Sequence, residues 1–406
     1  MLQVALGWEL YERTHSALAL GLVGLATALP VVILALPAGD IVDRLDRKRI
    51  LVWSQVAFIV AGLALGALSY WRGPVLLVYA ILLGRGAAQA FNNPARQALL
   101  PRLVPANVFG NAVTWASSAF QVAAVVGPGV GGVVIAIERG ATGAYLISSV
   151  LTAIYLWTLL EIRGGAAMQT DTVESATIAA TKQREKMTLE SVAAGMRFVR
   201  ETKVILAALT LDLFAVLLGG ATALLPIFAK DILRVGPEGL GWLRAAPSVG
   251  ALLIAVTIAH RPAMKRTGAT LLFAVAGFGA ATIIFGLSKS FWLSLAMLFV
   301  LGALDGISMI IRSTLVQLRT PDEMRGRVSA VNSVFIDMSN ELGGFESGAL
   351  AALVGPVTAV VAGGVGTLIV VGSVALAWPE LRQLGPLAPH EEATTKNTKD
   401  TKSIPR

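Results

Sequence analysis

The sequence predicts an all-α polytopic membrane protein. Of its 406 residues 55% are hydrophobic and only 14% are charged, whereas about a quarter of the residues in a soluble domain are charged. Apolar windows of about twenty residues recur along the chain, and a helix of that length crosses a hydrocarbon core of about 30 Å. The strands of a membrane barrel would alternate polar and apolar residues, so continuous apolar windows favour helices.

Twelve helices are expected, in two sets of six. Glycine, proline or charge separates them, and the connecting cations are, in order, Arg13, Arg44, Arg72, Arg96, Arg139, Lys182, Lys230, Arg261, Lys289 and Arg312. The first set is expected at residues 1–11, 17–38, 49–69, 74–95, 107–137 and 142–161, and the second at 204–229, 238–259, 268–288, 290–311, 326–353 and 356–378. The first helix is too short to span a membrane alone.

An internal repeat relates the two sets. Aligning the chain with itself pairs Gly24 with Gly241, Pro30 with Pro247, Arg44 with Arg261, Arg96 with Arg312, and Pro105 with Pro321. We therefore expect an N-terminal half over 1–162 and a C-terminal half over 204–378. Because helix 7 would begin near Val204, the repeat also predicts that helix 1 is truncated at Met1, through a misplaced start codon.

The polar segments outside the two halves are expected to lie in the cytoplasm. The linker over 163–203 ends in an apolar series at helical spacing, which predicts an amphipathic helix on the membrane surface. That series is Leu189, Val192, Ala193, Met196 and Val199. The tail over 379–406 is polar and of mixed charge, which is typical of a disordered segment.

The distribution of positive charge predicts the orientation. Most of the 33 lysine and arginine residues lie in one series of alternate loops and in the C-terminal tail. This series includes the loop with Arg44 and the linker, and positively charged loops face the cytoplasm. We therefore expect a multi-pass protein of the plasma or inner membrane with a cytoplasmic C-terminus. Topology accounts for the net charge of +8 without a nucleic-acid partner.

A charged motif follows the second predicted helix. Gly39, Asp43, Arg44, Arg47 and Lys48 form the pattern G-x-x-x-D-R-x-x-R-K. The pattern resembles the loop between helices 2 and 3 of major facilitator superfamily transporters. The resemblance implies two parallel six-helix halves with a substrate site between them, opened alternately to either side.

The resemblance also implies a role for each residue of this motif. Asp43 would close the cytoplasmic face by meeting the N-terminal end of helix 11 near Gly326. Arg44, Arg47 and Lys48 would assist that closure or bind lipid phosphates, and the alternative is that they only set the topology. Asp46 stands where many members of the superfamily carry glycine.

Further segments resemble one subgroup, the secretion effectors and enterobactin-exporter-like permeases. They are W-x-L-Y at 8–11 and the segments 93–101, 219–233 and 236–243. In helix 5, Gly127, Pro128, Gly131 and Gly132 resemble part of a motif associated with antiporters. The alternative for helix 5 is close packing of helices through small residues.

Charged residues inside apolar windows are candidates for proton coupling or substrate binding. Arg85 resembles an arginine that the superfamily links to proton transfer, and the alternative is a structural pair with an interior carboxylate. The candidate acids are Asp212, Asp305, Asp337 and Glu341, with Asn340 beside them. Asp337 and Glu341 are four residues apart and share one helix face, so we favour this pair. The alternative is that the acids bond neighbouring helices or Arg244.

No pattern typical of an enzyme is present in the sequence. There is no cysteine, the histidines fall in predicted loops or the tail, and no phosphate-binding G-x-x-x-x-G-K-[ST] pattern occurs. We expect neither a metal nor a cofactor, and an ion gradient as the energy source.

The expected function is proton-coupled export of a small amphipathic molecule, such as a siderophore or a drug, by a monomer. The alternatives are uptake of a nutrient or lysophospholipid, and a membrane sensor that binds its ligand without moving it.

Overall fold

A computed structural model describes residues 1–162, 189–261 and 266–386, and these residues contain helices but no strand. The helices of the first half are α1 (Leu2–Thr14), α2 (Ala17–Arg44), α3 (Arg47–Tyr70), α4 (Val75–Leu103), η1 (Ala106–Val108), α5 (Phe109–Glu138) and α6 (Thr142–Glu161). Those of the second half are α9 (Lys203–Leu218), η2 (Ala221–Leu224), α10 (Leu225–Ile227), η3 (Phe228–Ile232), α11 (Gly236–Ala259), α12 (Thr267–Leu287), α13 (Phe291–Arg319), α14 (Asp322–Val354) and α15 (Pro356–Ala377). Two further helices, α8 (Leu189–Glu201) and α16 (Pro379–Arg382), flank the second half.

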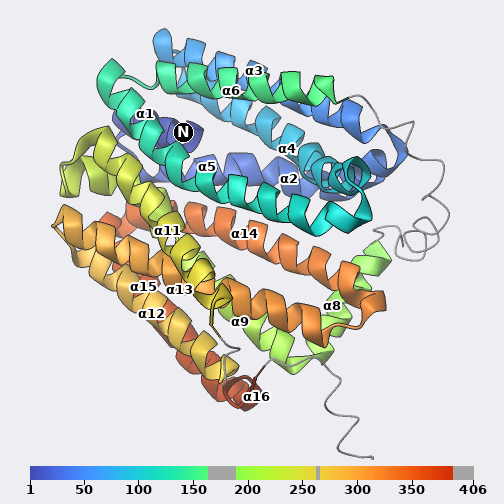
Figure 1. Ribbon diagram of the computed structural model, residues 1–406. Coiled ribbons are helices and arrows are strands. Elements are labelled where there is room, and N and C mark those ends of the chain that lie inside the picture. The colour runs from blue at the N-terminus through green and yellow to red at the C-terminus, as the bar shows by residue number, and fades with distance from the viewer. Residues whose placement is uncertain (163–188, 262–265, 387–406) are drawn as a thin grey trace, which may run out of the picture.

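The two halves form two layers of helices (Figure 1). In the first half α3 packs against both α4 and α6, and in the second half α12 packs against both α13 and α15. The layers meet mainly where α2 contacts α14 and α5 contacts α11. The helices α2, α5, α11 and α14 therefore line the boundary between the layers.

Ten helical segments are long and apolar enough to span a membrane within the described residues. The two remaining helices of the predicted twelve fall short for different reasons. The first, α1, has only 13 residues. The other, α14, has 33 residues but carries several charged side chains, which lower its hydropathy. The prediction of an all-α polytopic membrane fold is confirmed.

The seventh crossing is not the continuous helix that the sequence predicted over 204–229. It breaks after Leu218, at Gly219 and Gly220, and continues through the short turns η2, α10 and η3. Tight packing accounts for the two glycines, because a side chain at Gly220 would overlap the carbonyl of Gly343 in α14, and one at Gly219 would overlap the ring of Phe278. The break leaves main-chain groups without their usual intrahelical partners.

Several helices run further than their apolar windows. The second was predicted to end at residue 38, but α2 continues to Arg44, and the motif turn consists of Leu45 and Asp46 alone. Asp46 caps α3, where its side chain accepts a hydrogen bond from the Lys48 amide at 3.0 Å. Likewise α4 ends at Leu103 and α13 at Arg319 rather than at residues 95 and 311. Hydropathy marks only the part of a helix inside the hydrocarbon, while its polar ends continue into the interface.

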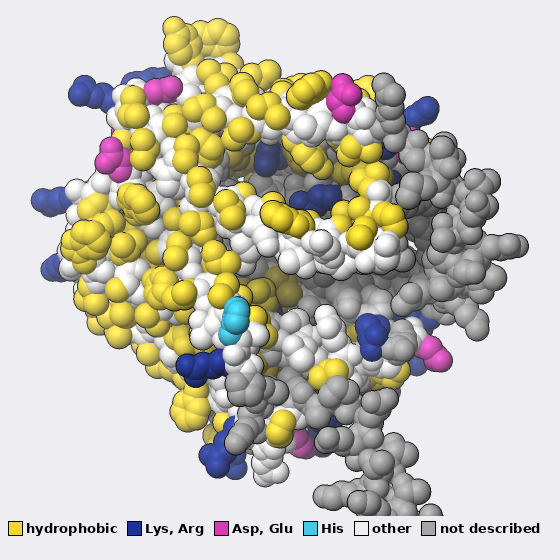
Figure 2. Space-filling model, viewed as in Figure 1, with side chains coloured by type: hydrophobic (Ala, Val, Ile, Leu, Met, Phe, Trp, Pro, Cys, Tyr) yellow, Lys and Arg dark blue, Asp and Glu magenta, His cyan; other side chains and the backbone are white. Residues whose placement is uncertain are grey.

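The halves are closed at one end and open at the other. We call the end with the α2–α3 turn the motif end, and the end with the α1–α2 turn the far end. Toward the far end, a Cβ on Gly21 would lie 3.0 Å from the Phe345 carbonyl oxygen, and one on Gly132 would lie 3.0 Å from the Gly241 Cα. At the motif end, a Cβ on Gly39 or Gly326 would meet nothing within 4 Å among the described residues. Figure 2 shows a hollowed region on the first-half side of α5, with cationic side chains inside it.

The amphipathic helix α8 packs on the second half rather than standing apart from it. Its Val199 is fully buried with Val328 and Val331 of α14, and a Cβ on Gly195 would lie 2.9 Å from the Arg327 carbonyl oxygen. The rest of the predicted linker, residues 163–188, lies outside the described residues, as do residues 387–406 of the predicted tail.

Candidate transport site

Glu341 is the predicted acid that lies between the two halves. It is half-buried on α14, where a Cβ on Gly24 of α2 would approach its Oε2 to 3.1 Å. Thr27, one turn along α2, donates a hydrogen bond from its Oγ1 to the same Oε2 at 3.3 Å. Because Thr27 belongs to the first half, the carboxylate of Glu341 contacts both halves.

Arg244 of α11 lies close enough to Glu341 for an electrostatic interaction. Its Nη1 donates to the Thr222 carbonyl oxygen at 3.2 Å, and its Nη2 donates to Gln3 Oε1 at 3.0 Å. Thr222 lies in the break of the seventh crossing, and Gln3 lies on α1 of the first half. One guanidinium thus joins a carboxylate, a main-chain carbonyl and the opposite half.

We call Gln3, Thr27, Thr222, Arg244 and Glu341 the central polar cluster. The sequence pointed to Glu341, and to Arg244 as a possible partner, but not to Gln3, Thr27 or Thr222. These three are ordinary polar residues in apolar windows, and only the tertiary fold brings them together. The cluster contains both a cation and an anion at the boundary between the halves, where a charged group is costly unless it is paired or binds a ligand.

Arg85 lies elsewhere in the first half. Its guanidinium stands over the ring of Phe58 of α3, 4.8 Å from the centroid, which is a cation–π contact. Among the described residues no carboxylate forms an ion pair with it. Its neighbour Gly86 packs directly against the carbonyl of Thr27, which places Arg85 one helix away from the central polar cluster.

Asp212 and Asp305 lie inside the second half and outside the central polar cluster. Asp212 of α9 forms an ion pair with Arg312 of α13, and both residues are buried. The sequence placed Arg312 in a loop, but α13 extends beyond it to Arg319, so this cation is in the helix interior. Asn340 is exposed and donates to the Ile336 carbonyl oxygen at 2.8 Å.

The motif residues differ in their surroundings. Lys48 donates from its Nζ to the carbonyl oxygens of Leu160 at 3.1 Å and Ile162 at 2.6 Å, and so caps the C-terminal end of α6. Arg44 is exposed and Arg47 is half-buried. The side chains of two predicted residues, Asp43 and Asp337, lie outside the described part of the structure.

The glycines of the helix-5 motif allow close packing. Gly131 lies against Met1 of α1, and a Cβ there would be 2.9 Å from the Met1 Cα. The backbone of Gly132 approaches that of Gly241, and a Cβ on Gly241 would in turn be 2.8 Å from the Pro128 carbonyl oxygen. Gly127 has the Met1 nitrogen 3.4 Å from its Cβ position. Small residues at these positions let α5 reach both α1 and α11.

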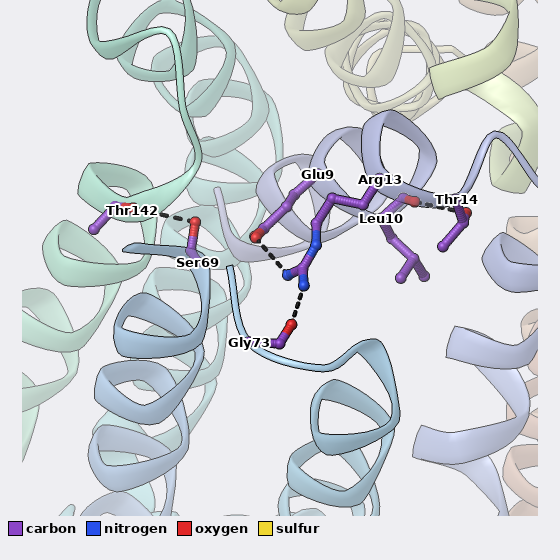
Figure 3. Close-up of polar contacts among 7 residues, drawn as sticks. All are labelled: Glu9, Leu10, Arg13, Thr14, Ser69, Gly73 and Thr142. Atoms are coloured by element: carbon purple, nitrogen blue, oxygen red, sulfur yellow. Dashed lines mark hydrogen bonds and ion pairs between the residues drawn. The ribbon is translucent and has the colours of Figure 1, made fainter. Parts of the chain in front are cut away.

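At the far end, one set of polar contacts lies within the first half (Figure 3). Arg13 pairs with Glu9 at 3.1 Å and donates to the Gly73 carbonyl, while Thr142 Oγ1 donates to Ser69 Oγ at 3.1 Å. These contacts tie α1 to the α3–α4 turn and join α6 to α3.

A second set of far-end contacts crosses between the halves. Tyr11 donates a hydrogen bond to Asp231, and Lys230 Nζ lies 3.8 Å from Glu12 Oε1. We call these four residues the far-end latch. It borders a cavity of about 400 Å³ whose polar lining residues include His15 and Ser16. In the sequence these charges indicate only the topology, and the contacts between them were not predicted.

Comparison with known proteins agrees with this architecture. The model of the transmembrane secretion effector family matches residues 1–398. The chain is 29% identical over 395 residues to the multidrug efflux pump Tap of Mycolicibacterium fortuitum, covering 94% of this chain and 92% of the relative. It is 25% identical over 398 residues to the enterobactin exporter EntS of Escherichia coli, covering 97% of this chain and 91% of the relative.

Solved transporter structures share the fold at low sequence identity. The nucleoside transporter NupG matches with a TM-score of 0.65 at 17% identity, covering 94% of each chain. The inward-open conformation of the xylose transporter XylE from E. coli matches with a TM-score of 0.64 at 12% identity, covering 95% of this chain and 94% of that one. These proteins are transporters rather than enzymes, in agreement with the sequence-based expectation. The chain belongs to the transmembrane secretion effector family of major facilitator superfamily transporters.

Proposed function

We propose that this protein exports a small amphipathic molecule, of the siderophore or drug-like class, across the plasma or inner membrane in exchange for protons. Two efflux proteins among its relatives support the direction of transport and the substrate class. In this proposal the protein acts as a monomer, because the site lies between two halves of one chain. The lipid bilayer and the transported molecule are its partners.

The single observation that carries the proposal is the position of Glu341. Its carboxylate lies on α14 of the second half and accepts a hydrogen bond from Thr27 of the first half at 3.3 Å. A carboxyl group at such a boundary is exposed to one side of the membrane and then to the other as the halves rock. It can therefore release a proton on one side and bind one on the other, while Arg244 competes with the proton for the carboxylate.

The conformation fits an inward-facing state of this cycle. The charge distribution supports a cytoplasmic location for the motif end and the C-terminus. The motif end is open around Gly39 and Gly326, while the far end is closed by the far-end latch. In the opposite state, Asp43 and the neighbouring cations would meet the N-terminal end of α14 and close the cytoplasmic face.

Proteoliposomes with ethidium, and separately with a catecholate siderophore, added outside them test the proposal. An imposed proton gradient should drive accumulation that a protonophore abolishes. Glu341→Gln should lower gradient-driven transport at least about 10-fold, the size expected when an essential charged hydrogen-bonding group is lost. Exchange of labelled for unlabelled substrate without a gradient should persist.

Glu346→Gln is the matched control, because this second half-buried acid of α14 lies five residues further along and is hydrogen-bonded only by Ser347 at 3.4 Å in the described structure. Full proton-driven transport by both Glu341→Gln and Asp337→Asn would overturn the coupling assignment. Gradient-driven movement in the opposite direction would identify an importer. Saturable binding without flux by folded protein would identify a sensor.

A further inference from the structure

A small, partly open cavity lies inside the second half, away from the central polar cluster. Its volume is about 10 Å³, which is the space of about one water molecule. Three oxygen-bearing side chains line it, Asp212 of α9 and Asp305 and Ser308 of α13. The remaining lining side chains, from α9, α12 and α13, are all uncharged and apolar.

The polar groups around this cavity are not all satisfied. Asp212 is paired with Arg312, and both are buried. Ser308 is only 3% exposed, yet neither its hydroxyl nor the Asp305 carboxyl has a hydrogen bond or ion pair within the described ranges. A buried hydroxyl and a half-buried carboxyl that face one water-sized space without protein partners indicate a bound species.

The charges define what that species is. Asp212 and Asp305 are the acids that face the cavity, and Arg312 is the cation beside them, so the ionised cluster has one negative charge in excess. Asp305 is the central residue of α13, about 21 Å from either end of the helix. An unbalanced carboxylate at that depth is costly, and one monovalent cation removes the imbalance. A divalent ion would leave an excess positive charge and requires more oxygen ligands than these three groups supply.

We propose that Asp305 and Ser308, beside the Asp212–Arg312 pair, bind one monovalent cation, either a proton or sodium. Oxygen ligands suit both species, and the volume admits either a water next to a protonated carboxyl or a single sodium ion. This inference extends the proposed function, on which it rests for the claim that the bound cation drives transport. The site is separate from Glu341 and lies entirely within one half.

The seventh crossing connects the cation site to the transport site. Asp212 lies on α9, and the same chain continues through the glycine break to Thr222, whose carbonyl oxygen accepts a hydrogen bond from Arg244 at 3.2 Å. A cation bound at Asp305 changes the electrostatic potential at the Asp212–Arg312 ion pair. The broken segment then transmits this change to the central polar cluster.

Binding can be tested without any transport. Thermal unfolding of the purified full chain in lipid nanodiscs is followed during titration with NaCl, against choline chloride at matched ionic strength. A ligand that binds the folded state raises the unfolding temperature. A saturable sodium-specific rise of a few degrees, absent from Asp305→Asn, would identify sodium. If only the pH dependence of the unfolding temperature differs between the wild type and Asp305→Asn, the cation is a proton.

Two further variants keep the test decisive if Asp305→Asn folds poorly. Ser308→Ala should raise the sodium or proton concentration needed for the half-maximal response about 10-fold, as expected for the loss of one hydrogen-bonding ligand. Ser313→Ala is its control, because this serine is exposed on the same helix and bonds only the Ile310 carbonyl, at 3.0 Å. Identical salt and pH responses of wild type, Asp305→Asn and Ser308→Ala would overturn the proposal.

Transport assays then separate this inference from the proposed function. With ethidium in proteoliposomes, Asp305→Asn should retain exchange without a gradient and lose most gradient-driven accumulation. If the wild-type protein moves no substrate but shows the Asp305-dependent thermal shift, the proposed function fails and the cation site stands. If the wild type is driven by protons and Asp305→Asn is driven equally well, the site does not couple transport.

Discussion

Tyr11 of α1 donates a hydrogen bond to Asp231 of η3 and so joins residues 220 positions apart in different halves of the chain. The ring of Tyr11 also stands beside the Lys230 ammonium group, with 6.0 Å between that nitrogen and the ring centroid. Tyr11 is buried, whereas Asp231 is exposed. The contact therefore lies where the far end of the bundle meets solvent, and it stabilises the conformation that is open at the motif end.

Removing this hydrogen bond should favour the opposite conformation. Tyr11→Phe keeps the ring and deletes the donor, at a cost to the closed far end of about 1 kcal/mol, because one partner is exposed. Spin labels at Leu45→Cys and Ser329→Cys, in a chain without natural cysteine, report the opening of the motif end. The shorter-distance population should rise about 5-fold. Tyr70→Phe, at an exposed tyrosine of α3, should leave the distribution unchanged.

Arg244 and Glu341 should be energetically coupled. Each single substitution, Arg244→Gln or Glu341→Gln, leaves the other charge at the boundary between the halves. The double variant should be more stable than the sum of the single effects predicts, by about 1 to 3 kcal/mol. Thermal or denaturant unfolding in a mild detergent gives the four stabilities. Strict additivity would show that the two side chains do not interact in solution.

The Asp212–Arg312 pair should show the behaviour of a buried ion pair. Arg312→Met alone leaves a buried carboxylate and should cost about 3 to 5 kcal/mol, whereas combining it with Asp212→Leu should restore most of the loss. The unfolding temperature of the purified protein measures both effects. Lys203→Met is the control, since its pair with Glu380 is exposed, with side-chain exposures of 69% and 47%. Its unfolding temperature should not change.

Two neighbouring glycines of α5 should respond differently to a methyl group. At Gly132 a Cβ would collide with the Pro237 carbonyl and the Gly241 backbone, whereas at Gly129 it would meet nothing within 4 Å among the described residues. Gly132→Ala should therefore separate α5 from α11 and lower transport and folded yield, by about 1 to 3 kcal/mol in stability. Gly129→Ala should be tolerated. Comparable yields and transport for both variants would contradict the role in packing.

Lys48 should stabilise the end of α6. Lys48→Met removes two hydrogen bonds to carbonyl oxygens and a favourable charge at a helix C-terminus, which together contribute about 1 to 2 kcal/mol. Hydrogen exchange of the amides near Ile162 should quicken, and the unfolding temperature should fall slightly. Arg49→Met is the comparison, because that side chain is 84% exposed and pairs with Asp46 only at 3.8 Å.

Hydropathy predicted the membrane helices well because burial in lipid constrains every residue of a span. It failed at the ends, since α2 and α13 carry their charged last turns beyond the apolar core as continuous helix. It also missed the break at Gly219 and Gly220, because glycine is common in membrane helices and its effect depends on the neighbour that approaches it. Here the neighbours are Gly343 and Phe278, which are distant in sequence.

The candidate site was predictable only in part, for a related reason. Glu341 was identified because a carboxylate in an apolar window is costly wherever the helix lies. Gln3 and Thr27 carry no such signal, since uncharged polar residues are tolerated in spans and gain meaning only from their partners. Asp212 was one of four candidate coupling acids, and its pairing with Arg312 was not predicted because Arg312 was assigned to a loop. The depth of a cation depends on where its helix ends, which the sequence did not define.

The break in the seventh crossing has a consequence for how the central polar cluster responds to mutation. In an intact helix the carbonyl of Thr222 would be engaged within the helix, but here it faces Arg244 and accepts its hydrogen bond at 3.2 Å. A main-chain acceptor is present whatever residue occupies the position, so no exchange of side chains deletes it. Thr222→Ala should consequently leave the hydrogen bond to Arg244 in place. Moving the backbone itself, by inserting a residue into η2, should break it.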